Sequence, residues 1–191
     1  MLSTALKGIV ISPVFLALLL CQSALSSQNN GSIRDILQGS YSEEAILKTS
    51  DLYNSLDIGK EDKDGILDTV EWMASSNLSV DVILEYLNLV SELYDAGISI
   101  RDISLKAREG IAKGVSPERI IAVLNDRVQR LKDARVLVLT LENKGVEFLD
   151  KQMTYRILAN YLSRGISSEE IMSKVYESDF GDYRALESVV R

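Results

Sequence analysis

The chain has 191 residues, of which 46% are hydrophobic and 26% charged, the balance of a folded protein with a core of its own. Acidic residues outnumber basic ones by 28 to 21, and the formal net charge of −7 argues against non-specific binding to nucleic acid. The chain has no histidine, and its single cysteine is Cys21, so it lacks the commonest general base and has no second thiol for a disulfide or a cysteine-based zinc site.

The first 26 residues have the pattern of an export signal. Lys7 supplies a positive charge, an apolar run follows from Ile9 to Leu20, and Ala24-Leu25-Ser26 places small residues at the cleavage position. The run is shorter than the ~20 apolar residues of a membrane-spanning helix. Cleavage is therefore the first interpretation, and an uncleaved membrane anchor is the alternative.

Cys21 adds a second question about the same segment. The run that ends in Leu20-Cys21 resembles a bacterial lipobox in its hydrophobic lead-in, although Leu20 stands where a small residue is usual. Cys21 is thus a candidate lipidation site, and otherwise one more apolar residue of the leader. Each interpretation places the folded part outside the cytoplasm, in the periplasm or cell envelope or secreted, with contact to a membrane only through the leader or a lipid on Cys21.

The remainder of the chain predicts helices throughout. We expect a polar spacer and domain entry at 27–41 and a single α-helical domain at 42–191, with no segment that alternates as a strand does. A charged loop is expected from Asp57 to Gly65. In chain order, the predicted helices are 42–56, a short helix that carries Ile66, Val70 and Met73, then 80–96, 100–113, 116–143, 147–163, 168–177 and a terminal helix from Asp182.

A recurrent punctuation separates these helices. A glycine is followed by a β-branched residue and a helix-start signal at Gly97, Gly114, Gly145 and Gly165. Glycine takes the left-handed conformation that ends a helix, and in three of the four junctions a serine is expected to cap the next helix. The short junctions fold successive helices back on one another, and their unequal spacing favours an all-α, compact array of about six to eight antiparallel or orthogonal helices over a solenoid with a fixed unit.

Several side chains are assigned to packing. The run Val136-Leu137-Val138-Leu139 is apolar on all sides and is expected at the centre of the domain. Gly110 is expected to let another helix approach closely. Tyrosines at core-face positions are expected to pack in the same core; they are Tyr53, Tyr86, Tyr94 and Tyr161.

The acidic stretch 60–71 carries the best candidate for a metal site. Counted from Lys60, Asp62 takes the third position, Asp64 the fifth, Gly65 the sixth, Asp68 the ninth and Glu71 the twelfth. This spacing resembles the calcium loop of the EF-hand family, in which carboxylate oxygens surround the ion and glycine makes a sharp turn. Lys60 stands where that family has aspartate. Calcium bound by Asp62, Asp64, Asp68 and Glu71 is therefore one interpretation, and a solvated connection between two helices is the other.

The stretch from Lys106 to Arg135, above all 109–119, resembles a segment of exported bacterial helical proteins that have no assigned activity. That likeness implies a bacterial, extracytoplasmic setting and no particular site. The leading hypothesis is a non-enzymatic protein without a cofactor that binds another macromolecule of the cell envelope, most simply a protein. A calcium-binding module is the alternative, and a hydrolase that works through carboxylates comes third.

Overall fold

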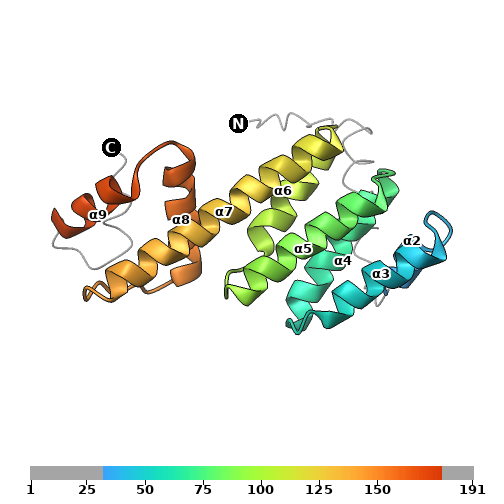
Figure 1. Cartoon of the computed structure of the whole chain (residues 1–191), viewed down its shortest axis with the longest axis horizontal. Helices are drawn as coiled ribbons and strands as arrows, with labels where there is room; N and C mark the ends of the chain where they lie inside the picture. The colour runs from blue at the N-terminus through green and yellow to red at the C-terminus, as the bar shows by residue number, and fades with distance from the viewer. Residues whose placement is uncertain (1–31, 178–191) are drawn as a thin grey trace, which may run out of the picture. The chain divides into compact units, whose positions relative to one another are not determined.

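The computed structural model describes residues 32–177, and this part of the chain consists of helices, turns and short connections without a strand. Its eight helices are labelled as in Figure 1. In chain order they are α2 (Ile33–Leu37), α3 (Glu43–Ser55), α4 (Lys60–Ser75), α5 (Val80–Asp95), α6 (Arg101–Ala112), α7 (Pro117–Glu142), α8 (Lys151–Ser163) and α9 (Ser168–Glu177). The prediction of an all-α fold is confirmed. The predicted leader with Cys21 and the predicted helix from Asp182 lie outside the described residues.

Most of the described helices pack on the helix next but one along the chain, and some also pack on the next helix. α2 contacts α3 and α4, α3 contacts α5, α4 contacts α6, and α5 contacts α7. α6, α8 and α9 all contact α7, which is 26 residues long. In the resulting array, α7 is the helix on which α6, α8 and α9 pack (Figure 1). Because its helices differ in length, the array has no fixed repeating unit.

Left-handed residues end the helices where the sequence places glycine. The φ angles of Gly97, Gly114, Gly145 and Gly165 are 65°, 64°, 90° and 85°, and Asn77 takes the same conformation at 56°. After α5, the amide of Ile98 donates to the Leu93 carbonyl at 2.9 Å, and that of Gly97 to the Tyr94 carbonyl at 2.8 Å. These two bonds satisfy carbonyls that a helix end leaves free, and they form the same pattern after each of the other four residues. The predicted punctuation is confirmed.

The serine caps are more varied than predicted. Ser167 accepts a bond from the Glu170 amide at 3.1 Å, and Ser99 accepts a long one from Arg101 at 3.4 Å. Ser116 makes no side-chain cap bond at the start of α7, where Pro117 occupies the first helical position. Proline has no N–H to be capped, so this helix start depends less on a side-chain acceptor.

Two predictions about the N-terminal part are wrong. α2 lies inside the expected spacer, with Ile33 and Leu37 buried, so the packed helices begin before residue 42. The expected charged loop is also mostly helix, because α4 begins at Lys60. Its first turns carry charged side chains toward solvent, and apolar periodicity begins only at Ile66. A helix that is polar in its first turns gives no amphipathic signal there.

Further differences concern α7 and α8. α8 begins at Lys151 rather than at 147, because the Asp150 side chain accepts the Met153 amide at 2.9 Å and so fixes the helix start. The apolar run in α7 is buried on one side only: Leu137 and Val138 are buried, while Val136 is 61% and Leu139 39% exposed.

Tyr94 departs from the expected core position, whereas Gly110 behaves as predicted. The Tyr94 ring is 38% exposed and its hydroxyl donates to the Asp57 carbonyl, while Tyr53, Tyr86 and Tyr161 are buried. A Cβ added at Gly110 would lie 2.9 Å from Cγ1 of Ile120, so the absence of a side chain lets α6 and α7 approach closely.

Candidate functional site

The four carboxylates of the predicted calcium loop lie on one helix. On α4, with 3.6 residues per turn, Asp62 lies on the opposite side from Asp64, Asp68 and Glu71. Within residues 32–177, no three acidic, cysteine or histidine side chains lie where they could hold a metal ion. The predicted loop conformation is therefore wrong. Calcium binding by these residues stays a prediction, and it requires the first turns of α4 to unwind.

The helix-end carboxylates are engaged in ordinary ion pairs. Glu142, at the end of α7, lies 2.7 Å from Lys151 Nζ, and this hydrogen bond raises the pKa of Lys151. Glu170 lies 3.4 Å from Lys174, one turn further along α9. Side-chain pairing accounts for both carboxylates, and the first turn of α9 favours the negative charge of Glu170 as well.

A groove lies between α7, α9 and the turn that joins α8 to α9. It encloses about 600 Å³. Its apolar lining combines side chains from three helices and one turn: Val136 and Leu137 of α7, Leu162 of α8, Ile166 of the turn and Met172 of α9. Its polar lining consists of Arg130, Asp133, Thr140, Ser167 and Ser168, with the backbone of Gly165.

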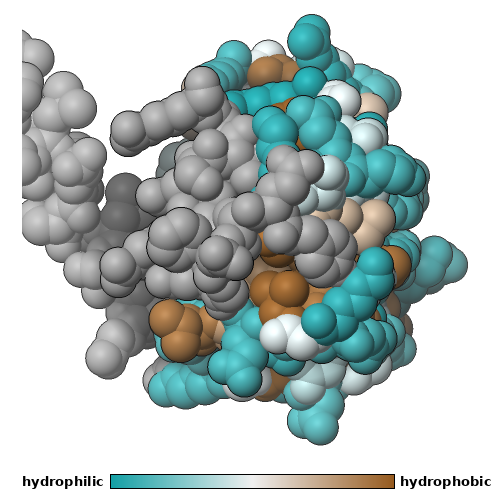
Figure 2. All heavy atoms as spheres, turned by 90° about the vertical axis from the view of Figure 1, so that its left-hand side faces the viewer, coloured by the Kyte–Doolittle hydropathy of each residue, from teal (hydrophilic) through white to brown (hydrophobic). Residues whose placement is uncertain are grey.

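The helical periodicity of α7 explains which of its residues line the groove. Leu131, Val138 and Leu141 face the core, so the successive turns at Asp133, Val136 and Thr140 face outward. Val136 is 61% exposed, the largest exposure in α7 among its large apolar residues. Figure 2 views the end of the protein that carries α9, where patches of hydrophobic side chains break the hydrophilic surface. An exposed apolar patch with a polar rim is typical of an interaction site.

The rim of the groove carries one charge of each sign. Arg130 pairs with Asp126 one turn earlier on α7, with 3.5 Å between Nε and Oδ1, and Nε is buried without a hydrogen-bond acceptor in the described residues. Asp133 accepts a hydrogen bond from Gln129 at 2.7 Å. The rim therefore carries a guanidinium that is paired with Asp126 and a carboxylate that is hydrogen-bonded to Gln129.

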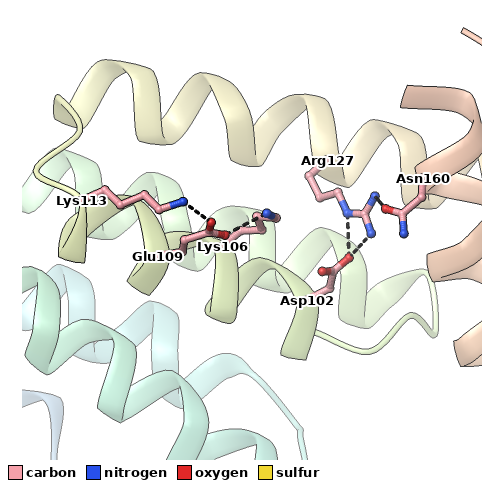
Figure 3. A network of polar contacts seen from close by, with 6 residues as sticks. All are labelled: Asp102, Lys106, Glu109, Lys113, Arg127 and Asn160. Atoms are coloured by element: carbon pink, nitrogen blue, oxygen red, sulfur yellow. Dashed lines mark hydrogen bonds and ion pairs between the residues drawn. The ribbon is translucent and has the colours of Figure 1, made fainter. Parts of the chain in front are cut away.

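A polar network fixes the helices that carry the groove walls (Figure 3). Arg127 of α7 donates through Nε to Asp102 of α6 at 2.7 Å and through Nη1 to Asn160 of α8 at 2.9 Å. The side chains of Arg127 and Asp102 are each only 12% exposed. Because Asn160 precedes Leu162 by two residues on α8, the network holds one wall of the groove against α7.

A second contact fixes the start of α8. The Gln152 side-chain amide donates to the Gly97 carbonyl at 2.8 Å and its oxygen accepts the Ser99 amide at 2.8 Å. The Gln152 side chain thus satisfies one backbone carbonyl and one backbone amide of the turn between α5 and α6. With the Arg127 network, this contact anchors both ends of α8.

Sequence reasoning did not find the groove. It treated 136–139 as central on the ground that all four residues are apolar. The polar neighbours Asp133 and Thr140, three and four residues from Val136, were the available signal that this side of α7 faces outward.

Among the helices of residues 32–177, none has both the length and the apolarity needed to cross a membrane. No protein-family model, no curated protein and no solved structure matches the chain.

Proposed function

We propose that the chain is an exported, non-enzymatic α-helical protein of the bacterial cell envelope, and that it binds an apolar segment of another protein in the groove between α7 and α9. The observation that carries this proposal is the groove itself. The groove has a volume of about 600 Å³. Five apolar side chains line it together with Thr140, Ser167 and Ser168, and its rim carries one positive and one negative residue. Such a lining suits the apolar face of a helical segment, with polar groups at the rim to orient it.

The composition supports binding over catalysis. The chain has no histidine, and its only cysteine lies in the predicted leader. The groove lining holds a single carboxylate, Asp133, so it lacks the pair of carboxylates that glycoside cleavage uses. Export is supported by the sequence of residues 1–26 alone.

The binding role can be tested by photo-cross-linking in intact cells. A photoreactive amino acid that replaces Thr140 lies on the groove wall. The same photoreactive amino acid in place of Leu47, which is 47% exposed on α3, serves as the matched control. We expect a discrete protein adduct from position 140 that is absent from position 47. Val136→Asp should abolish that adduct while the chain keeps its helical circular dichroism.

Identical adducts from both positions, or none from position 140, would refute the groove as a protein-binding site.

Export is tested separately by the mass of the mature chain recovered from cells. We expect an N-terminus at residue 27. A lipid-bearing N-terminus at Cys21 would establish a lipoprotein, and an N-terminus at Met1 an uncleaved leader.

A further inference from the structure

A small pocket lies between α4 and α6, where both helices begin. α4 packs on α6, and the pocket has a volume of about 190 Å³. Its lining combines residues at helical spacing from the two helices and one residue just before α6: Glu61, Asp62 and Gly65 of α4, Arg101, Ser104 and Arg108 of α6, and Ile100. None of these residues lines the groove beside α9, so this pocket is a separate site.

The inner part of the pocket belongs to the packed core. Ser104 is only 2% exposed, and its hydroxyl lies 2.8 Å from the hydroxyl of Tyr86 on α5, which is fully buried. The Ser104 hydroxyl also donates to the Ile100 carbonyl at 3.2 Å. These contacts tie α6 to α5 directly beneath the pocket. The pocket is therefore formed by the fold itself, as small-molecule sites usually are.

Charged side chains of both signs line the pocket. Glu61 and Asp62 are acidic, Arg101 and Arg108 are basic, and the formal charges cancel. Within residues 32–177, Glu61, Asp62 and Arg101 form no ion pair with another side chain. A lining with unpaired charges of both signs suits a ligand that itself carries one charge of each sign.

Arg108 is the charged residue of the lining that solvent reaches least. Its side chain is 28% exposed, and its Nη1 lies 3.9 Å from Asp68 Oδ2, which is longer than a hydrogen bond. Its Nε is buried and has no hydrogen-bond partner in the described residues. Buried donors without an acceptor are uncommon in folded proteins. A carboxylate in the pocket is the acceptor that a guanidinium binds most strongly, because it takes two N–H groups at once.

The volume of the pocket limits the size of its ligand. At roughly 30 Å³ for each water molecule, 190 Å³ holds about six waters. Drug-sized ligands and nucleotides need pockets of about 300 Å³ or more. The position of Gly65 adds to the available room, since no atom lies within 4 Å of the place that a Cβ would take there. The ligand is therefore a molecule of only a few non-hydrogen atoms.

From its charges and its size, we propose that this pocket binds a small free α-amino acid. Arg108 and Arg101 hold the carboxylate of the ligand. Glu61 and Asp62 attract its ammonium group, and Gly65 leaves space for its short side chain. The proposal does not depend on the groove beside α9, because the two sites share no residue.

The test is calorimetric titration of the full chain with glycine, L-alanine and L-serine. We expect at least one of the three to bind. Propionate matches L-alanine without its ammonium group, and ethylamine matches it without its carboxylate. Both should bind at least about ten-fold more weakly than the amino acid, because each forfeits one set of charge-assisted hydrogen bonds.

Variants of exposed or glycine positions locate the binding without loss of the fold. Arg101→Gln and Asp62→Asn should each weaken binding by at least about ten-fold. Their matched controls are Arg119→Gln on α7 and Asp81→Asn on α5, which are exposed charges outside this lining and should leave the affinity unchanged. Gly65→Leu should abolish binding, because its side chain fills the pocket, while the helical circular dichroism of the chain is kept.

Three results would overturn the proposal. Failure of all three amino acids to bind would mean that water alone fills the pocket. Equal binding of propionate and L-alanine would show a site for simple anions in which Glu61 and Asp62 play no part. Amino-acid binding that survives both Arg101→Gln and Gly65→Leu would place the site elsewhere on the chain.

Discussion

The two ends of α7 are covered in different ways. At its N-terminal end, α6 lies so close that a Cβ at position 110 would clash with Ile120, so this position is a glycine. Asp102 of α6 also pairs with Arg127 of α7 in a mostly buried contact. At its C-terminal end, α9 buries Ile171 and Val175 but leaves a groove of about 600 Å³ beside Met172. The contact between α6 and α7 is therefore closely packed, whereas the contact between α9 and α7 leaves an open groove; we call these the closed end and the open end of α7.

The same turn pattern precedes both covering helices. Gly97 leads to α6 and Gly165 leads to α9, with matching left-handed φ angles of 65° and 85°. The turn therefore sets the reversal of the chain and does not set how closely the next helix packs. Closeness depends on residue size at the contact, since a glycine on α6 admits Ile120 whereas Met172 and Leu137 line a gap.

The largest expected effect is at the closed end. Arg127→Met removes one partner of a mostly buried ion pair and leaves the Asp102 carboxylate without its cation. We expect the free energy of unfolding to fall by about 3 kcal/mol, because an unpaired buried charge is costly. Urea denaturation measures it.

Lys132→Met on the same helix is the matched control, since Lys132 pairs with Glu92 at 3.1 Å with both side chains largely exposed. That change should cost less than about 1 kcal/mol. Equal losses for Arg127→Met and Lys132→Met would mean that the closed end does not depend on the buried pair.

The next effect separates the two sides of α7 at its open end. Val138 is fully buried, and its neighbour Val136 is 61% exposed. Val138→Ala should lower the free energy of unfolding by about 2 kcal/mol through lost burial and a small cavity, whereas Val136→Ala should change it by less than about 0.5 kcal/mol. If Val136→Ala proves as costly as Val138→Ala, the groove side of α7 is covered in solution and Val136 does not line an open groove.

A smaller effect tests the close approach of α6 and α7. Gly110→Val places a side chain where a Cβ alone would lie 2.9 Å from Ile120, so we expect a loss of roughly 1–2 kcal/mol from overpacking, partly offset by better helix propensity. Gly65, inside α4, has open space at its Cβ position, and Gly65→Ala should raise the free energy of unfolding by about 1 kcal/mol. Stabilisation by both substitutions would show that α6 and α7 can move apart without cost.

The smallest effect depends on pH and concerns the exposed side of α6. Hydrogen bonds from Lys106 and Lys113, at 2.8 and 2.5 Å, lower the pKa of Glu109 from 4.5 to about 2 (Figure 3). A carboxylate with a lowered pKa stabilises the fold fully above pH 4.5, and the contribution fades as the pH falls toward 2.

The melting temperature of Glu109→Gln should therefore lie slightly below that of wild type at pH 6 and converge with it near pH 2. Because these groups are exposed, the difference should be the smallest of the four and should shrink in high salt. A difference that persists unchanged at pH 2 would contradict the assignment to ionised Glu109.

Parts of the fold that depend on neighbours in sequence could be predicted. The helix ends at Gly97 and Gly165 depend on residues within one turn, because a left-handed residue and its two backbone bonds satisfy the carbonyls of the same helix. The helix at 80–95 could be predicted from the three- and four-residue spacing of its apolar side chains. The calcium prediction failed on conformation for the opposite reason: its acidic residues match a loop pattern, yet Lys60–Ser75 is helical because its later turns bury Ile66, Val70 and Met73 in the core.

The sequence by itself thus determined an all-α chain and most of its reversals, since those depend on backbone conformations set within a few residues. Only the tertiary structure decided which side of 136–139 is buried, that Arg127 of α7 meets Asp102 of α6, and that a groove remains beside α9. These features depend on side chains from helices far apart in the sequence, and their sizes and charges act only once the helices are packed together.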